Sequence, residues 1–175
     1  MNCADQYGVF ANPDVISFHD QLKQAYDLRI EVAEQEQEVY TALEESVNFE
    51  LLVLFGHGIK ESLSLGENDL RELPVDKNET YTIDVSDNEL EKYLQHLHPS
   101  ATIFLYSCST GSGWEKENNL ANKIAGWAKG RTVIAPQEAL KTSRVNVDSI
   151  YPLEVRLLDE TGNKDITYVV SNNLK

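Results

Sequence analysis

The chain has 175 residues, of which 41% are hydrophobic and 25% are charged, a size and composition that suit one globular domain with its own core. Its 29 acidic residues outnumber its 15 basic ones, so the formal net charge is −14. This balance argues against nucleic-acid and anionic-membrane partners, because both need a basic surface, and it agrees with attraction of a basic substrate.

The cysteines and the start of the chain bear on the compartment. Cys3 and Cys108 are too few for a disulfide framework, and no Cys-x-x-Cys pair suggests a zinc site. Residues 1–6 carry neither a basic region nor an apolar run, so we expect no secretory signal. We therefore predict a cytoplasmic protein, or a piece of something larger, that holds no metal or other cofactor.

The first half of the chain alternates between helical and strand patterns. Asn12 and Pro13 form a helix start, after which Val15, Phe18 and Leu22 recur at helical spacing. The predicted elements are, in order, a helix over residues 12–25, a strand over 27–33, a helix over 34–47, a strand over 49–55, a short extension or hairpin over 59–65 and a loop over 66–84.

The second half continues this alternation. Ser86, followed three residues later by Glu89, is a capping-box signal for a helix that Pro99 ends. The predicted elements are a helix over residues 86–98, a strand over 101–106, a helix over 119–128, a strand over 132–135 closed by a proline, and a C-terminal β-hairpin of 153–158 and 166–170 around the turn 159–163.

These elements predict an α/β fold with a mainly parallel sheet and helices on both faces. The apolar runs at residues 49–55 and 101–106 are typical of strands that are buried on both sides. The first element found is a helix, whereas a sheet of this kind usually opens with a strand. Either the first strand is missing from the chain, or the C-terminal hairpin takes its place.

Two reactive side chains follow these two buried strands. His57 comes two residues after the run 49–55, and Cys108 comes two residues after the run 101–106. Because ligands bind at the carboxyl ends of strands in open parallel sheets, neighbouring strands would bring both side chains to one crevice. A thiol needs a base or a favourable field to become a nucleophile, and His57 is the only one of the four histidines at a strand end.

The same residues have ordinary structural alternatives. Taken alone, Cys108 fits the role of an inert thiol that is packed in the core. Taken alone, His57 fits the role of a residue that forms a hydrogen bond at the end of a strand. His19, His96 and His98 fall in predicted helices, where surface or capping roles are usual.

At these residues the sequence resembles the caspase-like cysteine peptidases, which include caspases, metacaspases, clostripain-like enzymes and the CHAT peptidases. The shared pattern is an apolar strand ending in His-Gly and a later one ending in a small residue and Cys, here LLVLFGHG (51–58) and TIFLYSCSTG (102–111). His57 precedes Cys108 by 51 residues, close to the spacing of roughly 50 in caspases.

The resemblance implies a single domain over residues 1–175 with a three-layer caspase-like sandwich. His57 would be the general acid/base, Cys108 the nucleophile, and Gly58 and Cys108 the oxyanion N–H donors. Peptide bonds would be cleaved through a thioester. The positions for substrate contact would be Tyr106, Ser107 and, from the opening loop, Asp5.

The sequence departs from the family at two points. Metacaspases carry an acidic residue where Tyr106 stands, and caspases have a Gln before the Cys that is absent here. Asp5 and the acidic net charge favour a basic residue at the cleaved position. A protein or peptide substrate and a regulatory protein partner are the partners that this interpretation implies.

Three other functions remain open. The chain would be an inactive caspase-like scaffold if Cys108 is unreactive, or another Cys-dependent hydrolase or acyl transferase such as a deamidase. A nucleotide-binding domain is the third, because residues 109–113 form a small-residue loop before a helix. The phosphate-loop and dinucleotide glycine motifs are both absent, which argues against it.

Overall fold

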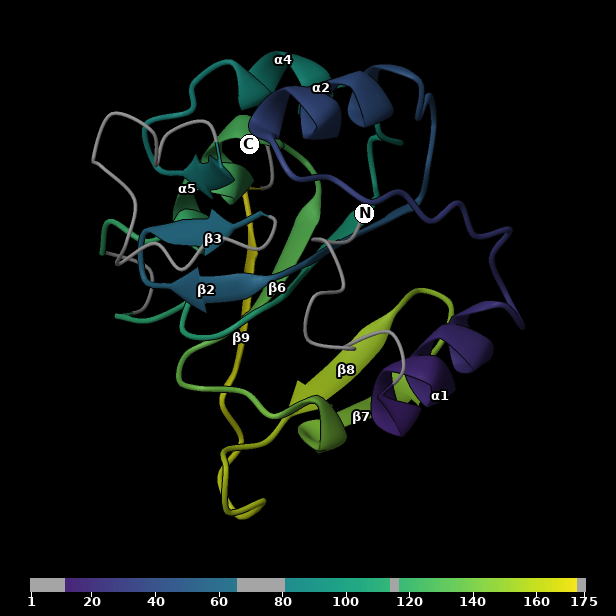
Figure 1. The fold of residues 1–175 in the computed structure, drawn as a ribbon, viewed down its shortest axis with the longest axis vertical. Helices are drawn as coiled ribbons and strands as arrows, with labels where there is room; N and C mark the ends of the chain where they lie inside the picture. Colours follow the sequence, from purple (N-terminus) through teal and green to yellow (C-terminus); the bar gives the residue numbers. More distant parts are fainter. Residues whose placement is uncertain (1–11, 66–80, 114–116, 173–175) are drawn as a thin grey trace.

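The computed structural model describes residues 12–65, 81–113 and 117–172 (Figure 1). Its central sheet has four strands in the order β1-β5-β6-β9, of which the first three are parallel and the last is antiparallel. The strands are β1 (Leu51–Phe55), β5 (Thr102–Tyr106), β6 (Thr132–Pro136) and β9 (Thr167–Ser171). The prediction of an α/β protein with a mostly parallel sheet is confirmed.

The position of β5 in the sheet explains why its sequence is almost entirely apolar. It lies between β1 and β6, and all five of its residues are buried. Ile103 and Leu105 face one layer of the core, whereas Phe104 and Tyr106 face the other. A strand that is covered on both faces has no polar side, so its pattern is a continuous apolar run.

Three helices cover the first face of the sheet. They are α2 (Glu36–Glu44), α4 (Leu90–Leu94) and α5 (Leu120–Trp127), and α2 and α4 lie side by side in Figure 1. Helix α5 begins at the cap Asn119, whose side chain accepts a hydrogen bond from the Asn122 backbone at 2.8 Å. Its apolar stripe packs on the sheet as the sequence predicts.

The opposite face is covered by α1 (Pro13–Leu22) and by an antiparallel pair, β7 (Val145–Ser149) with β8 (Glu154–Leu157). Phe18 of α1 meets Phe104 and Tyr106 edge-on, with ring centroids 5.9 and 5.4 Å apart. Asn12 caps α1 by accepting from the Asp14 backbone at 2.9 Å. The predicted helix start is therefore confirmed.

A small antiparallel sheet follows β1 directly. It consists of β2 (His57–Ile59), β3 (Ser62–Ser64) and β4 (Thr82–Asp84). Of the extension or hairpin expected over residues 59–65, the structure has the hairpin, although its first strand begins earlier, at His57. The predicted loop over 66–84 is wrong at its end, because Thr82–Asp84 pairs with β3. Residues 66–80 lie outside the described part of the chain.

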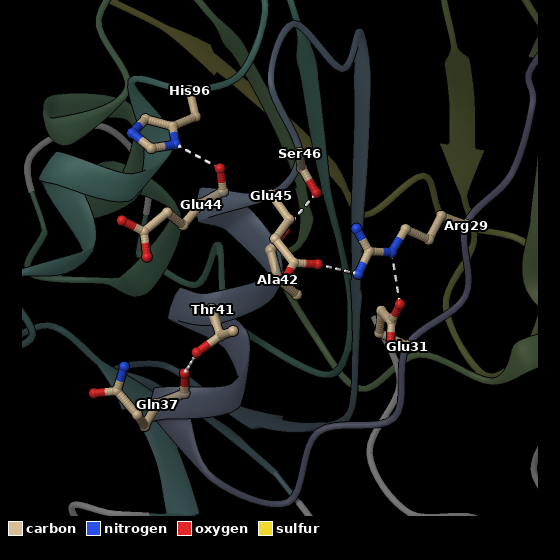
Figure 2. Close-up of polar contacts among 9 residues, drawn as sticks. All are labelled: Arg29, Glu31, Gln37, Thr41, Ala42, Glu44, Glu45, Ser46 and His96. Atoms are coloured by element: carbon tan, nitrogen blue, oxygen red, sulfur yellow. Dashed lines mark hydrogen bonds and ion pairs between the residues drawn. The ribbon is translucent and has the colours of Figure 1, made fainter.

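The strand predicted over residues 27–33 is not formed. This segment is extended, but it contributes only a single bridge residue and no strand. Ile30 and Val32 are exposed, and Arg29, which precedes them, forms ion pairs with Glu31 and Glu45 (Figure 2). The alternation of polarity is real, but these two apolar side chains face solvent and gain no burial from a sheet.

The predicted C-terminal hairpin is also wrong. The turn over residues 159–163 forms, and the Asp159 carboxylate accepts from the backbones of Asn163 and Lys164. Beyond one bridge between Leu158 and Asp165, however, the two strands separate, because β8 pairs with β7 and β9 pairs with β6. Strand β8 pairs with the strand that directly precedes it, and β9 pairs with a strand from a distant part of the chain.

The helix start predicted at Ser86 lies too early. The Ser86 hydroxyl donates to the Asp84 carboxylate, so it is not available as a helix cap, and α4 begins only at Leu90. The missing or replaced first strand was predicted from residues 2–12, most of which lie outside the described residues, so that interpretation stays a prediction.

Candidate active site

The two strands that carry the candidate residues are neighbours and run in the same direction. Phe55, the last residue of β1, is paired with Tyr106, the last residue of β5. One residue later the Gly56 N–H donates to the Tyr106 carbonyl at 3.4 Å. His57 and Cys108 each come two residues after the last paired position, so both leave the sheet at the same edge.

Gly58 brings the two segments into direct contact. A Cβ atom built on Gly58 would lie 2.4 Å from the Cys108 carbonyl oxygen, 2.8 Å from Cβ of Ser107 and 2.9 Å from Cγ2 of Thr110. The backbone after His57 therefore touches the turn that holds the cysteine, and a side chain at position 58 would keep the segments apart. The His57 side chain itself is exposed.

The Cys108 sulfur is held by the backbone of one residue. The Leu140 N–H donates to Sγ at 3.4 Å, and the Leu140 carbonyl lies 3.7 Å from Sγ as an acceptor for the thiol proton. The residue is a free thiol at intermediate exposure, so it is not sealed in the hydrocarbon core. The two backbone groups of Leu140 therefore fix the position of the Cys108 sulfur.

The turn after Cys108 is fixed by the segment that follows β6. Ser109 adopts a left-handed backbone with φ of 56°, which costs energy for a residue that is not glycine. Its N–H donates to the Glu138 carbonyl at 3.0 Å, and the Gly111 N–H donates to the Pro136 carbonyl at 2.9 Å. These bonds hold the strained turn in place.

Glu138 and Leu140 also belong to this site, and neither was predicted from the sequence. A signal was available, because Pro136 closes an apolar strand just as Gly56 and Ser107 do. If three parallel strands end at one edge of the sheet, then residues after the third must also lie there. What the pattern does not tell is which backbone group reaches the sulfur.

The positions predicted to contact substrate have other contacts in the structure. Tyr106 is buried, its hydroxyl donates to the Thr142 carbonyl at 3.0 Å, and burial raises the pKa of this phenol well above its usual value. Ser107 is also buried, and its hydroxyl is bonded to that of Thr110 at 2.9 Å. Asp5 lies outside the described residues. Substrate contact by all three stays a prediction, as does the oxyanion role of Gly58 and Cys108.

The remaining histidines lie away from Cys108. His96 bonds to the Glu44 carbonyl at the end of α2 at 3.1 Å, and His98 bonds to the nearby Ser100 hydroxyl at 2.9 Å. Within residues 12–65, 81–113 and 117–172, no three His, Cys, Asp or Glu side chains are grouped as metal ligands would be. In the same ranges no helix has the length and hydrophobicity to cross a bilayer.

The small-residue loop over 109–113 does not lead straight into a helix. Helix α5 starts at Leu120, and its first N–H groups already have acceptors: Leu120 and Ala121 donate to the carbonyls of Lys60 and Thr110, and Asn122 donates to the Asn119 side chain. The anion site considered for a nucleotide would need those groups. The geometry therefore does not favour the nucleotide-binding alternative.

Comparison with known proteins identifies a family. Residues 16–151 match the model of a family described as a domain of unknown function, DUF4347. The chain belongs to the DUF4347 family. The matched part of this DUF4347 domain includes His57, Cys108 and Leu140, whereas β8 and β9 follow it. The chain matches no curated protein and no solved structure.

Proposed function

We propose that this domain is a caspase-like cysteine peptidase, with Cys108 as the nucleophile and His57 as the general acid/base. The observation that carries the proposal is the contact between the backbone at Gly58 and the Cys108 turn, on neighbouring parallel strands. The order of the two residues, their spacing and the α/β sheet with helices on both faces are all similar to that family.

The chemistry proceeds in two steps. His57 accepts the proton of the Cys108 thiol, and the sulfur attacks the carbonyl carbon of the scissile peptide bond to give a tetrahedral oxyanion. His57 then protonates the leaving amine, which leaves a thioester. Water attacks the thioester, His57 takes its proton, and the acid product and free thiol are released.

Three features of the chain support these steps. The Leu140 N–H and carbonyl both bond to the sulfur and fix its position before attack. The backbone bonds of Ser109 to Glu138 and of Gly111 to Pro136 hold Cys108 at the end of its strand, although Ser109 is strained. Gly58 has no side chain, so the strand-end backbone can approach a substrate carbonyl closely, and its N–H with that of Cys108 would serve as oxyanion donors.

The substrate proposed is a protein or peptide with a basic residue at the cleaved position. It rests on the formal net charge of −14, which attracts cations at a distance. Asp5 is the residue proposed to meet the basic side chain at the site.

The test is hydrolysis of a peptide library by the full chain and by single variants. Cys108→Ala and His57→Ala should each lower the rate at least about a thousandfold, because the two groups act as a unit. Cys3→Ala and His98→Ala are the matched controls and should retain activity, since neither residue belongs to the proposed pair.

Alkylation separates the peptidase from its alternatives. Iodoacetamide should label Cys108 faster at neutral pH than an ordinary thiol, and His57→Ala should slow the labelling. Full activity in His57→Ala would disprove the pairing. An unreactive Cys108 with no hydrolysis would instead identify the domain as an inactive scaffold.

A further inference from the structure

A cavity of about 380 Å³ opens on the side of β1 that is remote from His57. It is bounded by the C-terminal part of α1, by residues 25–30 and by the residues that lead into β1. Leu22, Leu28 and Leu51 give it an apolar wall. Because Leu51 begins β1 whereas His57 follows its last residue, the cavity and the candidate active site lie at opposite ends of one strand.

The charged groups of this cavity leave it negative. Asp27 and Glu50 both line it. Arg29 lines it as well, but its guanidinium is held by Glu31 and by Glu45, each at 2.6 Å, so its charge is more than balanced (Figure 2). Two carboxylates on the wall and two more around the arginine therefore exceed the one positive charge.

The histidine of the cavity does not change this balance. His19 lines the same cavity, and burial, followed by the charge of Lys23, lowers its pKa below the ordinary value of 6.5. The imidazole is therefore mostly neutral at pH 7 and contributes little positive charge.

An aromatic ring of the cavity wall is separated from one of the carboxylates by a second ring. Tyr26 lines the cavity, and its ring lies 5.8 Å from that of Tyr151, whose hydroxyl donates to the Glu50 carboxylate at 3.1 Å. Burial raises the pKa of Tyr26, so this phenol is neutral at pH 7. An aromatic face beside a carboxylate attracts a cation twice, through the ring quadrupole and through the charge.

We propose that this cavity binds the side chain of an arginine that belongs to a peptide or protein. The apolar wall takes the methylene stem, Glu50 takes the guanidinium, and the ring of Tyr26 stacks on its plane. A free amino acid fits less well, because its own carboxylate would lie close to Asp27 and Glu50. The site is separate from Cys108 and does not depend on peptidase activity.

The probe for this site is acetyl-arginine methylamide, titrated into the full chain carrying Cys108→Ala so that no hydrolysis can intervene. We expect a dissociation constant in the millimolar range, as is usual for a ligand of this size, with amide shifts in residues 25–30 and 48–53. The neutral isostere acetyl-citrulline methylamide should bind about threefold or more weakly, and added salt should reduce the difference.

Two variants and one control locate the contact. Glu50→Gln should weaken binding of the arginine probe about threefold, and Asp27→Asn should weaken it in the same direction. Glu91→Gln removes an exposed carboxylate of α4, which does not line the cavity, and should leave the affinity unchanged. Asp27→Asn serves as the second measurement if Glu50→Gln disturbs the fold.

Three outcomes would overturn the proposal. Equal affinity for the citrulline and arginine probes would show that the charge of the ligand plays no role. Amide shifts confined to residues outside the cavity walls would show that the probe binds elsewhere. Tighter binding of free arginine than of the blocked probe would contradict the peptide source.

Discussion

Gly58 decides how closely the two parts of the candidate active site approach each other. A methyl group there would meet a backbone oxygen of Cys108 at 2.4 Å, and a backbone atom cannot move aside as the end of a flexible side chain can. The cost of such overpacking is typically about 1–3 kcal/mol. The absence of a side chain at position 58 is therefore required for this close contact, independently of any catalytic role of the Gly58 N–H.

At the residue scale we therefore predict the effect of Gly58→Ala. It should lower the free energy of unfolding by about 1–3 kcal/mol and slow the alkylation of Cys108, because the His57 segment must move away from the turn. Urea unfolding and the iodoacetamide labelling rate are the two measurements.

Gly126→Ala is the matched control for this substitution. Nothing lies within 4 Å of a Cβ at position 126, which is inside α5, so the change should raise stability by about 0.5–1 kcal/mol and leave labelling unchanged. If Gly58→Ala behaved in the same way as this control, the close packing of the two segments would be refuted.

At the scale of elements, one buried arginine ties α4 to the start of β6. Arg131 is only 4% exposed, and its guanidinium donates to the carbonyls of Gln95 at 3.2 Å and Leu97 at 2.6 Å. The last carbonyls of a helix have no partner within the helix, and a cation at that end is favourable. Arg131 thus completes the end of a helix of five residues that has little stability of its own.

We predict that Arg131→Met destabilises the protein by about 1–3 kcal/mol, because the Leu97 and Gln95 carbonyls would remain buried without donors. The measurement is the midpoint of urea unfolding. Lys129→Met, two residues earlier and exposed, is the control and should change stability by less than about 0.5 kcal/mol. A similar small effect for both variants would show that water replaces the arginine at no cost.

At the scale of the whole molecule, the excess of acidic residues opposes folding. The described ion pairs are exposed, and pairs of this kind contribute roughly 0–1 kcal/mol each. The net charge of −14 acts over the entire surface, and repulsion of this kind is relieved when salt screens it.

We accordingly expect the midpoint of thermal unfolding to rise when sodium chloride is increased from 20 to 500 mM. At the higher concentration the screening length falls to about 4–5 Å, which removes most long-range repulsion but also weakens the exposed pairs. A fall in the midpoint would mean that the ion pairs outweigh the repulsion between like charges.

The elements that could be predicted from sequence are those whose burial pattern is strong within the element itself. Helix α1 with its cap Asn12, the buried strand β5 and helix α5 were all predicted within a few residues. The strand expected over residues 27–33 and the hairpin expected at the C-terminus failed, because a strand needs partners that its own pattern does not identify.

For the candidate site, the residue types and the edge of the sheet were predictable, but the surroundings of the sulfur were not. Two apolar runs that end alike predicted a shared edge on the condition that the strands are neighbours, and the pairing of Phe55 with Tyr106 meets this condition. The Cys108 sulfur contacts the backbone N–H and carbonyl of Leu140. Because every residue except proline has both groups, no side-chain pattern could predict these contacts.

The amino-acid sequence by itself determined the α/β class, the strands that end in His57 and Cys108, and the acidic character of the surface, because each depends on local pattern or on composition. Only the tertiary structure decided that β8 and β9 join different sheets, that Gly58 touches the Cys108 turn, and that a negative cavity lies beside β1. These features depend on contacts between segments far apart in the chain, and their free energy exists only once the core has brought the segments together.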